Sequence, residues 1–266
     1  MTLIKKNLLY LFLIGASISC FAQDNTEESN TEIKIGGKVG YSLGSLTSST
    51  ENIFTDDYES ISGIDFGLTF EFKLTALISM QTELNYTHRG GERNGLQPVT
   101  ANELSETLNS FYPFAGIPLI TNENPLYATF HSEPDLQYLE IPALLKFGWG
   151  DNLRFSAAIG PYVGILLKAT QVTSGTSQFY LDSEGTMPIS DAILLDAKTN
   201  IKDDLKTVNF GGTLAIGISK KLGDTGQLFV DARTSYGINY IQIKDVYGES
   251  NVGGVIFSLG YAYTLQ

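Results

Sequence analysis

The chain has 266 residues and a formal net charge of −12, with 42% hydrophobic and only 17% charged residues. This composition is too apolar for a disordered protein, and the acidic balance excludes a basic protein that binds nucleic acid through its phosphates. The chain has no run of eighteen apolar residues, so the sequence predicts no membrane-spanning helix. Because glycine and aromatic residues are frequent, we expect an all-β protein.

The first residues have the features of an export signal. Lys5 and Lys6 precede an apolar run that ends at Ile18, and small residues follow. We predict a signal peptide over residues 1–22 and then a short acidic leader over 23–32. The alternative is a lipoprotein signal in which Cys20 is acylated. Cleavage after Ala22 would remove the only cysteine, which excludes disulfides and thiol chemistry from the mature chain.

Residues 33–266 form the predicted barrel domain, in which polar and apolar residues alternate along eight segments. A period of two is typical of β-strands, because successive side chains point to opposite faces. Transmembrane strands of about ten residues show the same alternation. The eight segments begin at Ile33, Ile64, Ile78, Leu139, Leu153, Val208, Leu228 and Val255.

The links between these segments alternate in length. Short turns are predicted over 74–77, 148–152 and 220–226, and long links over 45–61, 91–135, 168–205 and 239–251. Transmembrane barrels have short periplasmic turns and longer extracellular loops. The predicted fold is therefore an eight-stranded antiparallel up-and-down transmembrane β-barrel with long extracellular loops, located in the cell outer membrane.

Alternation alone does not decide which face of the wall meets lipid. A soluble barrel would bury its apolar face, whereas a membrane barrel would turn the polar face into the lumen. Charges of both signs fall on the polar face, as a lumen requires, because an unpaired buried charge costs several kcal/mol. With the export signal and the loop asymmetry, this favours lipid outside. The charged residues concerned include Asp65, Glu71, Glu83, Arg89, Glu140, Lys146, Asp231 and Arg233.

Four short stretches resemble a known family. They are LNYTHRGG at 84–91, LQYLEIP at 136–142, GPYVG at 160–164 and SLGYAYTL at 258–265. With them the chain resembles the PorT-like bacterial outer-membrane β-barrel family over roughly residues 33–266. The last stretch is also similar to the signal read by the barrel-assembly machinery, although Leu265 stands where an aromatic residue is usual. The resemblance implies fold and location, and it implies no activity.

Few residues suggest catalysis or metal binding. We expect His88 to lie at the membrane interface, since no Ser or Asp partner is visible for it. His131 has acidic neighbours, but one histidine gives no metal-ligand spacing. Asp56, Asp57 and Glu59 lack the pattern of a calcium loop, as does the Asp203–Asp204 pair. The sequence therefore predicts no enzyme, no cofactor and no metal site.

The second long link is the candidate binding region, because Phe111, Tyr112 and Phe114 form an apolar patch there. A capping box at 100–103 predicts a short helix to about residue 109. Ser190 is the expected N-cap of another helical stretch, through Leu195. The alternative is that these segments only pack over the barrel mouth.

We expect the chain to contact outer-membrane lipid and to bind a protein or an apolar ligand at the extracellular loops, without nucleic acid. The leading function is a scaffold or loop-mediated binding. A narrow pore or small-ligand carrier is the alternative, and an outer-leaflet lipid-modifying enzyme comes third.

Overall fold

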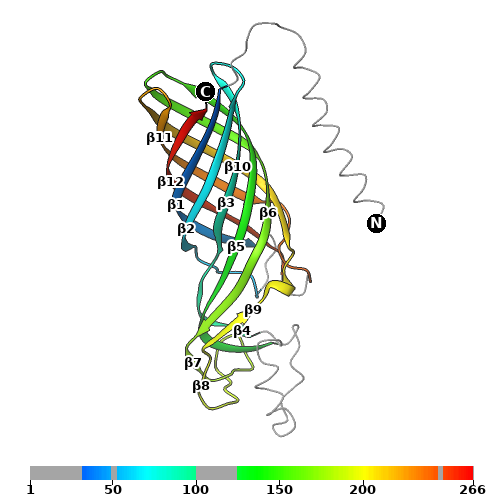
Figure 1. Ribbon diagram of the computed structural model, residues 1–266. Coiled ribbons are helices and arrows are strands. Elements are labelled where there is room, and N and C mark those ends of the chain that lie inside the picture. Colours follow the sequence, from blue (N-terminus) through cyan, green and yellow to red (C-terminus); the bar gives the residue numbers. More distant parts are fainter. Residues whose placement is uncertain (1–31, 49–52, 100–124, 245–247, 266) are drawn as a thin grey trace, which may run out of the picture. The chain divides into compact units, whose positions relative to one another are not determined.

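A computed structural model describes residues 32–48, 53–99, 125–244 and 248–265. Residues Glu32–Gln266 belong to one compact unit, which is a closed, elongated barrel (Figure 1). The predicted signal peptide and leader, apart from Glu32, lie outside the described residues. In the described part of the chain, no helix is long and apolar enough to cross a membrane.

Eight antiparallel strands close the barrel. In chain order they are β1 (Ile33–Ser48), β2 (Ile61–Lys73), β3 (Ile78–Gly90), β5 (Leu126–Trp149), β6 (Leu153–Ser174), β10 (Val208–Leu222), β11 (Gly226–Gly237) and β12 (Ser250–Leu265). Each pairs with the next around the ring, and β1 closes it by pairing with β12 from Ile33↔Leu265 to Ser48↔Ser250. The predicted eight-stranded antiparallel up-and-down barrel is confirmed.

Short turns join β2 to β3, β5 to β6 and β10 to β11, all at one end of the barrel. We call it the turn end, and the opposite end the loop end. The first and last residues of the wall, Ile33 and Leu265, are paired at the turn end, as an even number of strands requires.

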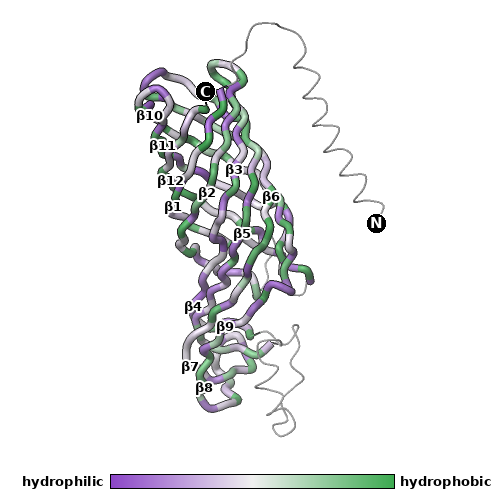
Figure 2. The backbone as a smooth tube through the Cα atoms, in the orientation of Figure 1, coloured by the Kyte–Doolittle hydropathy of each residue, from purple (hydrophilic) through white to green (hydrophobic). Residues whose placement is uncertain are grey.

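The wall has an apolar outer face and a polar inner face, as predicted. Outward side chains such as Ile64, Phe66 and Leu214 are half or more exposed, whereas Glu83 and Arg89 on the inner face are 1% and 0% exposed. Figure 2 shows the resulting alternation of hydrophilic and hydrophobic residues along each strand. Such an exposed apolar surface is stable only against lipid, so the barrel is a membrane barrel.

The predicted link over 91–135 is wrong in its boundaries. The segment contains a strand of its own, β4 (Arg93–Val99), and β5 already begins at Leu126. β4 pairs with the first part of β5, from Arg93↔Ser132 to Val99↔Leu126. The reason is that β5 and β6 stay paired well beyond the barrel wall. Beyond the wall, the edge of β5 is free to pair with β4.

The predicted link over 168–205 also contains strands. β6 runs on to Ser174, and β9 (Ala197–Asn200) pairs with its last part. β7 (Thr176–Ser177) pairs with β8 (Ile193–Leu194), and a 3-10 turn, η2 (Lys202–Asp204), follows β9. The strands β4, β5, β6 and β9 thus form a four-stranded sheet at the loop end, here called the loop-end sheet.

The first and the last of the four long links, predicted over 45–61 and 239–251, are shorter than predicted. β1 extends to Ser48, and β12 begins at Ser250. The helix expected from Ser190 to Leu195 is wrong, since Ile193 and Leu194 lie in β8. Instead of capping a helix, the hydroxyl of Ser190 accepts a hydrogen bond from the backbone N–H of Phe179 at 2.9 Å. The helix expected over 100–109 lies outside the described residues.

Candidate functional site

The middle of the lumen is filled by a network of charged side chains around Glu83 of β3. Arg233 of β11 donates to both carboxylate oxygens of Glu83, at 2.6 and 2.9 Å. Lys38 of β1 lies 2.6 Å from the same carboxylate, and Asn85 donates to it at 2.8 Å. Arg233 also pairs with Asp231 at 3.3 Å. We call Lys38, Glu83, Asp231 and Arg233 the central ion network; it joins the three strands β1, β3 and β11.

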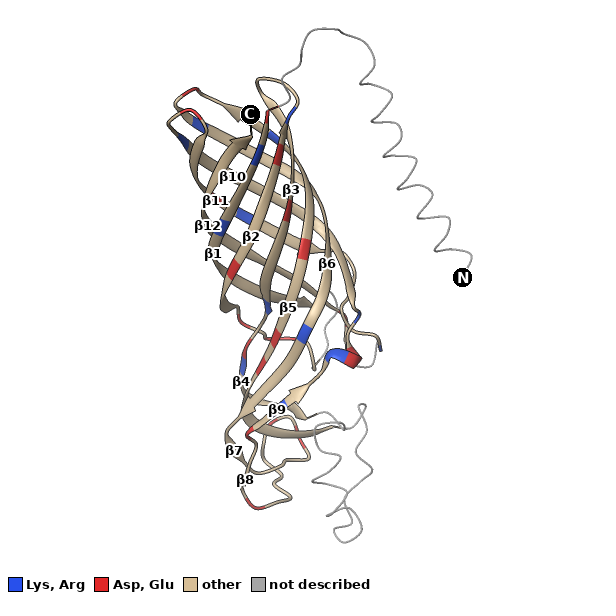
Figure 3. Cartoon of the chain, viewed as in Figure 1, with Lys and Arg blue, Asp and Glu red and all other residues tan. Residues whose placement is uncertain are grey.

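A second charged group lies nearer the loop end. Arg89 at the end of β3 is fully buried and lies 2.9 Å from Glu140 of β5. Asp65 of β2 is buried within electrostatic reach of both residues. In Figure 3 the charged residues of the wall stand at separate levels along the strands. The pairing of Arg89 with Glu140 explains how these two charges are tolerated inside a barrel.

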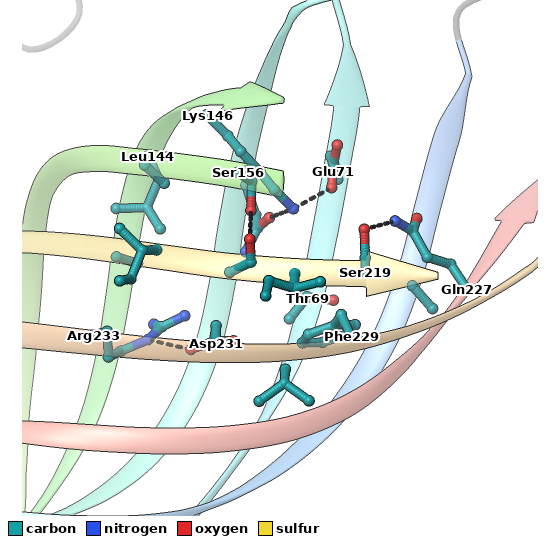
Figure 4. A pocket seen from close by; sticks show the side chains of 18 of the residues that line it. Thr69, Glu71, Leu144, Lys146, Ser156, Ser219, Gln227, Phe229, Asp231 and Arg233 are labelled. Carbon is teal, nitrogen blue, oxygen red and sulfur yellow. Dashed lines mark hydrogen bonds and ion pairs between the residues drawn. The ribbon is translucent and has the colours of Figure 1, made fainter. Parts of the chain in front are cut away.

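The turn end of the lumen contains a third polar group. Lys146 lies 2.8 Å from Glu71 and 2.9 Å from the side-chain oxygen of Gln81. Figure 4 shows Lys146 and Glu71 beside Ser219, Gln227 and Phe229 around a small space inside the barrel, which Gln81 also lines. The space measures only ≈ 40 Å³. A cavity of that size holds about three water molecules, so this part of the lumen is nearly full.

An apolar cluster crosses the lumen at the loop end. It consists of Leu136, Tyr138, Leu166, Ala169, Leu205, Ile241 and Val252, all buried. These residues come from β5, β6, β12 and the links beside β10 and β11. Together with the charged groups below it, the cluster closes the interior of the barrel. This agrees with the rule that eight strands enclose a space just wide enough for side chains.

Above this cluster lies a cavity of ≈ 180 Å³, here called the loop-end cavity. Its walls come from the 53–58 segment, the loop-end sheet and the segment around Ile241, and they are largely apolar. Leu46, Phe130, Leu136 and Ile201 provide part of the apolar wall, while Arg93 and Gln97 add polar groups. A mostly apolar cavity with a few polar groups is the usual form of a small-ligand site.

The sequence-predicted site residues fall in different places. Phe111, Tyr112 and Phe114 lie outside the described residues. His88 is half-buried on the outer face of the wall, as expected; its Nδ1 is 2.9 Å from the carbonyl oxygen of Ile64 and its ring packs edge-on against Tyr86. His131 lies on the outer face of the loop-end sheet, beside Glu133.

The structure also brings Glu92 next to His131 and Glu133, a grouping that the sequence analysis missed. This grouping could have been found in the sequence only through the hairpin register of β4 against β5. Neither β4 nor the extension of β5 to Leu126 was predicted. These three side chains could hold a metal ion. Glu71, Glu83, Glu140 and their basic partners are ion-paired within the lumen.

Solved barrel structures are similar to this chain only in their general fold. Ail, the attachment invasion locus protein of Yersinia pestis, is 11% identical and has a TM-score of 0.37, covering 88% of this chain and 99% of its own. Neisserial surface protein A is 9% identical, with a TM-score of 0.37 and coverages of 87% and 96%. The outer membrane protease OmpT of Escherichia coli is 10% identical, with a TM-score of 0.30 and coverages of 91% and 99%.

The comparison with curated proteins gave no match. The family model described as "Outer membrane protein beta-barrel domain", in contrast, matches residues 21–242, which is most of the chain. The closed ring of eight strands and the apolar outer face agree with this match. The chain therefore belongs to the outer membrane protein β-barrel domain family, and its location is the outer membrane.

Proposed function

We propose that the protein is a non-catalytic outer-membrane barrel that acts as a scaffold or binds a partner at its loop end. The observation that carries this proposal is the closed interior, in which paired charges and an apolar cluster fill the lumen. A barrel whose lumen is filled by side chains can act on other molecules only through its surface. Within the described residues, the loop-end sheet and its cavity form a structured region outside the wall.

The finer parts of the proposal follow from the sequence. The signal peptide is cleaved after Ala22, the chain is of the PorT-like type, and the loop end is extracellular. Phe111, Tyr112 and Phe114 belong to the binding surface, because their segment leaves and re-enters the loop-end sheet between Val99 and Leu126. A protein or an apolar ligand is the proposed partner.

The test removes this segment without disturbing the sheet. Val99 and Leu126 are direct cross-strand partners, so a two-residue Asn-Gly turn can replace residues 100–125. Partners would be captured by chemical cross-linking on intact cells, with the parent, the shortened variant and a variant in which Phe111, Tyr112 and Phe114 are all Ser. We expect both variants to keep the heat-modifiable gel mobility of a folded barrel and to lose the cross-linked species.

Two results would contradict the proposal. If the shortened variant no longer assembles as a barrel, the segment serves packing and not recognition. If both variants retain the cross-linked partner, binding does not involve this segment.

The alternative function is a narrow pore or small-ligand carrier, favoured by the loop-end cavity directly above the lumen. Planar-bilayer conductance separates the two functions. A closed barrel gives no steady conductance in the parent protein. Steady single-channel steps in the parent would favour the pore. A lipid-modifying enzyme remains third, and release of fatty acid from phospholipid vesicles by the purified protein would favour it.

A further inference from the structure

Three potential metal ligands meet on the outer face of the loop-end sheet. They are Glu92, just before β4, and His131 and Glu133 in β5; one ligand atom of each lies within 4.8 Å of the others. The Nε2 of His131 and a carboxylate oxygen of Glu133 are 3.6 Å apart. All three residues are half-buried, so they are accessible to an ion from solvent.

The backbone fixes the positions of these residues. His131 and Glu133 are two apart in a strand, so they share one face. The ladder that pairs Arg93 with Ser132 places Glu92 opposite Glu133. Glu92 is also held by two backbone hydrogen bonds with Glu59, at 2.7 and 2.9 Å. On the other side, β6 pairs with the same stretch of β5, so the ligands stand on a sheet and not on a loop.

The charges on this face favour a bound cation. Glu92 and Glu133 carry like charges at opposed positions of neighbouring strands, an arrangement that destabilises a sheet. Glu59, the bridge partner of Glu92, adds a third carboxylate near them. The neighbouring cation Arg93 does not neutralise them, because it faces the loop-end cavity on the other side and donates to the carbonyl oxygen of Ile53 at 2.8 Å.

The ligand types favour a transition metal. Magnesium and calcium take oxygen ligands, whereas zinc binds imidazole nitrogen and carboxylate oxygen together. Ligand atoms at tetrahedral angles around zinc, with bonds of about 2.1 Å, are roughly 3.4 Å apart. The 3.6 Å between His131 and Glu133 is close to this spacing. The ligand atom of Glu92 lies within 4.8 Å of the other two.

We propose that Glu92, His131 and Glu133 form a binding site for a divalent transition-metal ion, with Zn²⁺ as the representative ion. Three protein ligands leave one tetrahedral position for water or for a group of a bound partner. The ion would join β4 to β5 outside the membrane wall. This site is independent of the proposed function of the loop-end segment.

The experiment measures Zn²⁺ binding by the full-length mature protein in detergent micelles, without a polyhistidine tag, by competition with a chromophoric chelator. We expect one Zn²⁺ per chain. His131→Ala and Glu92→Gln should each weaken binding by about tenfold or more. Co²⁺ gives a second readout, because a tetrahedral site with nitrogen and oxygen ligands produces an intense visible spectrum, which these two variants should lose.

Matched controls use the nearest equivalent residues. His88→Ala removes the other histidine of the chain, whose Nδ1 is occupied by a backbone contact. Asp135→Asn changes the next outward carboxylate of β5, which accepts a hydrogen bond from Gln137. Both controls should bind Zn²⁺ as the parent does. All variants should keep heat-modifiable mobility, because the site lies outside the wall.

The proposal is overturned if the parent shows no saturable Zn²⁺ binding at millimolar concentrations. It is also overturned if His131→Ala and Glu92→Gln, still folded, bind as tightly as His88→Ala and Asp135→Asn.

Discussion

The barrel wall and the loop-end sheet share strand β5 but use its two faces in opposite ways. Between Leu139 and Trp149, outward residues such as Ile141 and Leu145 are apolar and exposed, whereas the inner face carries Glu140 and Lys146. Between Leu126 and Gln137 the outward residues are mostly polar, and the inner face is apolar. The polarity inverts near Gln137 and Tyr138, where the pairing with β6 also shifts register.

This inversion shows what surrounds each region. An apolar outer face with a polar lumen is stable in lipid, and a polar outer face with an apolar interior is stable in water. The point of inversion therefore marks the height at which β5 and β6 leave the membrane. Substitutions in the wall and in the loop-end sheet should therefore affect the stability of the barrel to different degrees.

The largest effect should come from the central ion network. Glu83→Gln leaves Arg233 and Lys38 buried without their shared carboxylate. Removing one partner of a buried ion pair costs about 3–5 kcal/mol. We expect Glu83→Gln to lose heat-modifiable mobility at a much lower temperature or urea concentration than the parent. The same substitution at Glu133, on the water-facing side of the loop-end sheet, should change stability little without added metal.

A quadruple variant tests the reason for this effect. Replacing Glu83, Arg233 and Lys38 by Leu, Met and Met, and Asp231 by Asn, removes all four charges of the network at once. It should recover much of the stability lost in Glu83→Gln. If Glu83→Gln is as stable as the parent, the network does not hold the lumen together.

The lipid-facing side should be the next most sensitive. Leu214 of β10 is 53% exposed and lies at mid-height of the strand. Phe70 of β2 lies on the same outer face of the barrel wall. An arginine at the bilayer midplane of a barrel costs about 2–4 kcal/mol. Leu214→Arg and Phe70→Arg should impair assembly into phospholipid vesicles. Thr129→Arg is the matched control, because Thr129 is an exposed outward residue of β5 beyond the inversion, and it should assemble normally.

If Phe70→Arg and Leu214→Arg assemble as well as Thr129→Arg, the outer face of the wall does not meet lipid. That result would overturn the assignment of the two faces.

A core substitution in the loop-end region should leave the wall intact. Phe179 is 3% exposed and packs in a cluster with Val99, Leu126, Ala128 and Phe130. A Phe→Ala substitution in a packed core lowers the free energy of unfolding by about 3–5 kcal/mol. Here the loss should destabilise the loop-end region and not the membrane wall. We expect Phe179→Ala to expose residues 176–200 to limited proteolysis and to keep the parent's heat-modifiable mobility. A barrel that melts with this variant would show that the two regions unfold as one.

Most of the wall could be predicted from the sequence, because its outward residues are apolar and alternate with glycines and charges. Ile64, Phe66 and Leu68 already identify both the strand and its lipid face. The polar lumen was predicted for the same reason. Which charges pair, such as Glu83 with Arg233, depends on the closure of the ring and could not be read from local alternation.

The loop-end sheet was missed for a physical reason. The strand was recognised by apolar residues on its lipid face, and this signal ends at Leu139 because the outer face meets water beyond it. The inner residues Leu126, Ala128 and Phe130 continue the period of two, now as the core of a water-exposed sheet. The cavity and the Glu92–His131–Glu133 cluster depend on this sheet, so neither could be predicted.

The smallest effect concerns the start of the wall at the turn end. Glu32, just before β1, accepts a hydrogen bond from Lys73 at 2.7 Å and lies 3.3 Å from Lys34. The hydrogen bond from Lys73 is the main cause that lowers the pKa of Glu32 below its ordinary value. A lowered carboxyl pKa gives stability that is present above the unfolded-state pKa and is lost as the pH falls through the folded value. Exposed ion pairs contribute only about 0.2–1 kcal/mol, so the barrel should stay folded below pH ~4.5 while this contact opens. An NMR titration of the Glu32 carboxyl carbon in micelles should give a midpoint below the ordinary value, and Lys73→Met should raise it. An unchanged midpoint in Lys73→Met would show that Lys73 does not stabilise the Glu32 carboxylate.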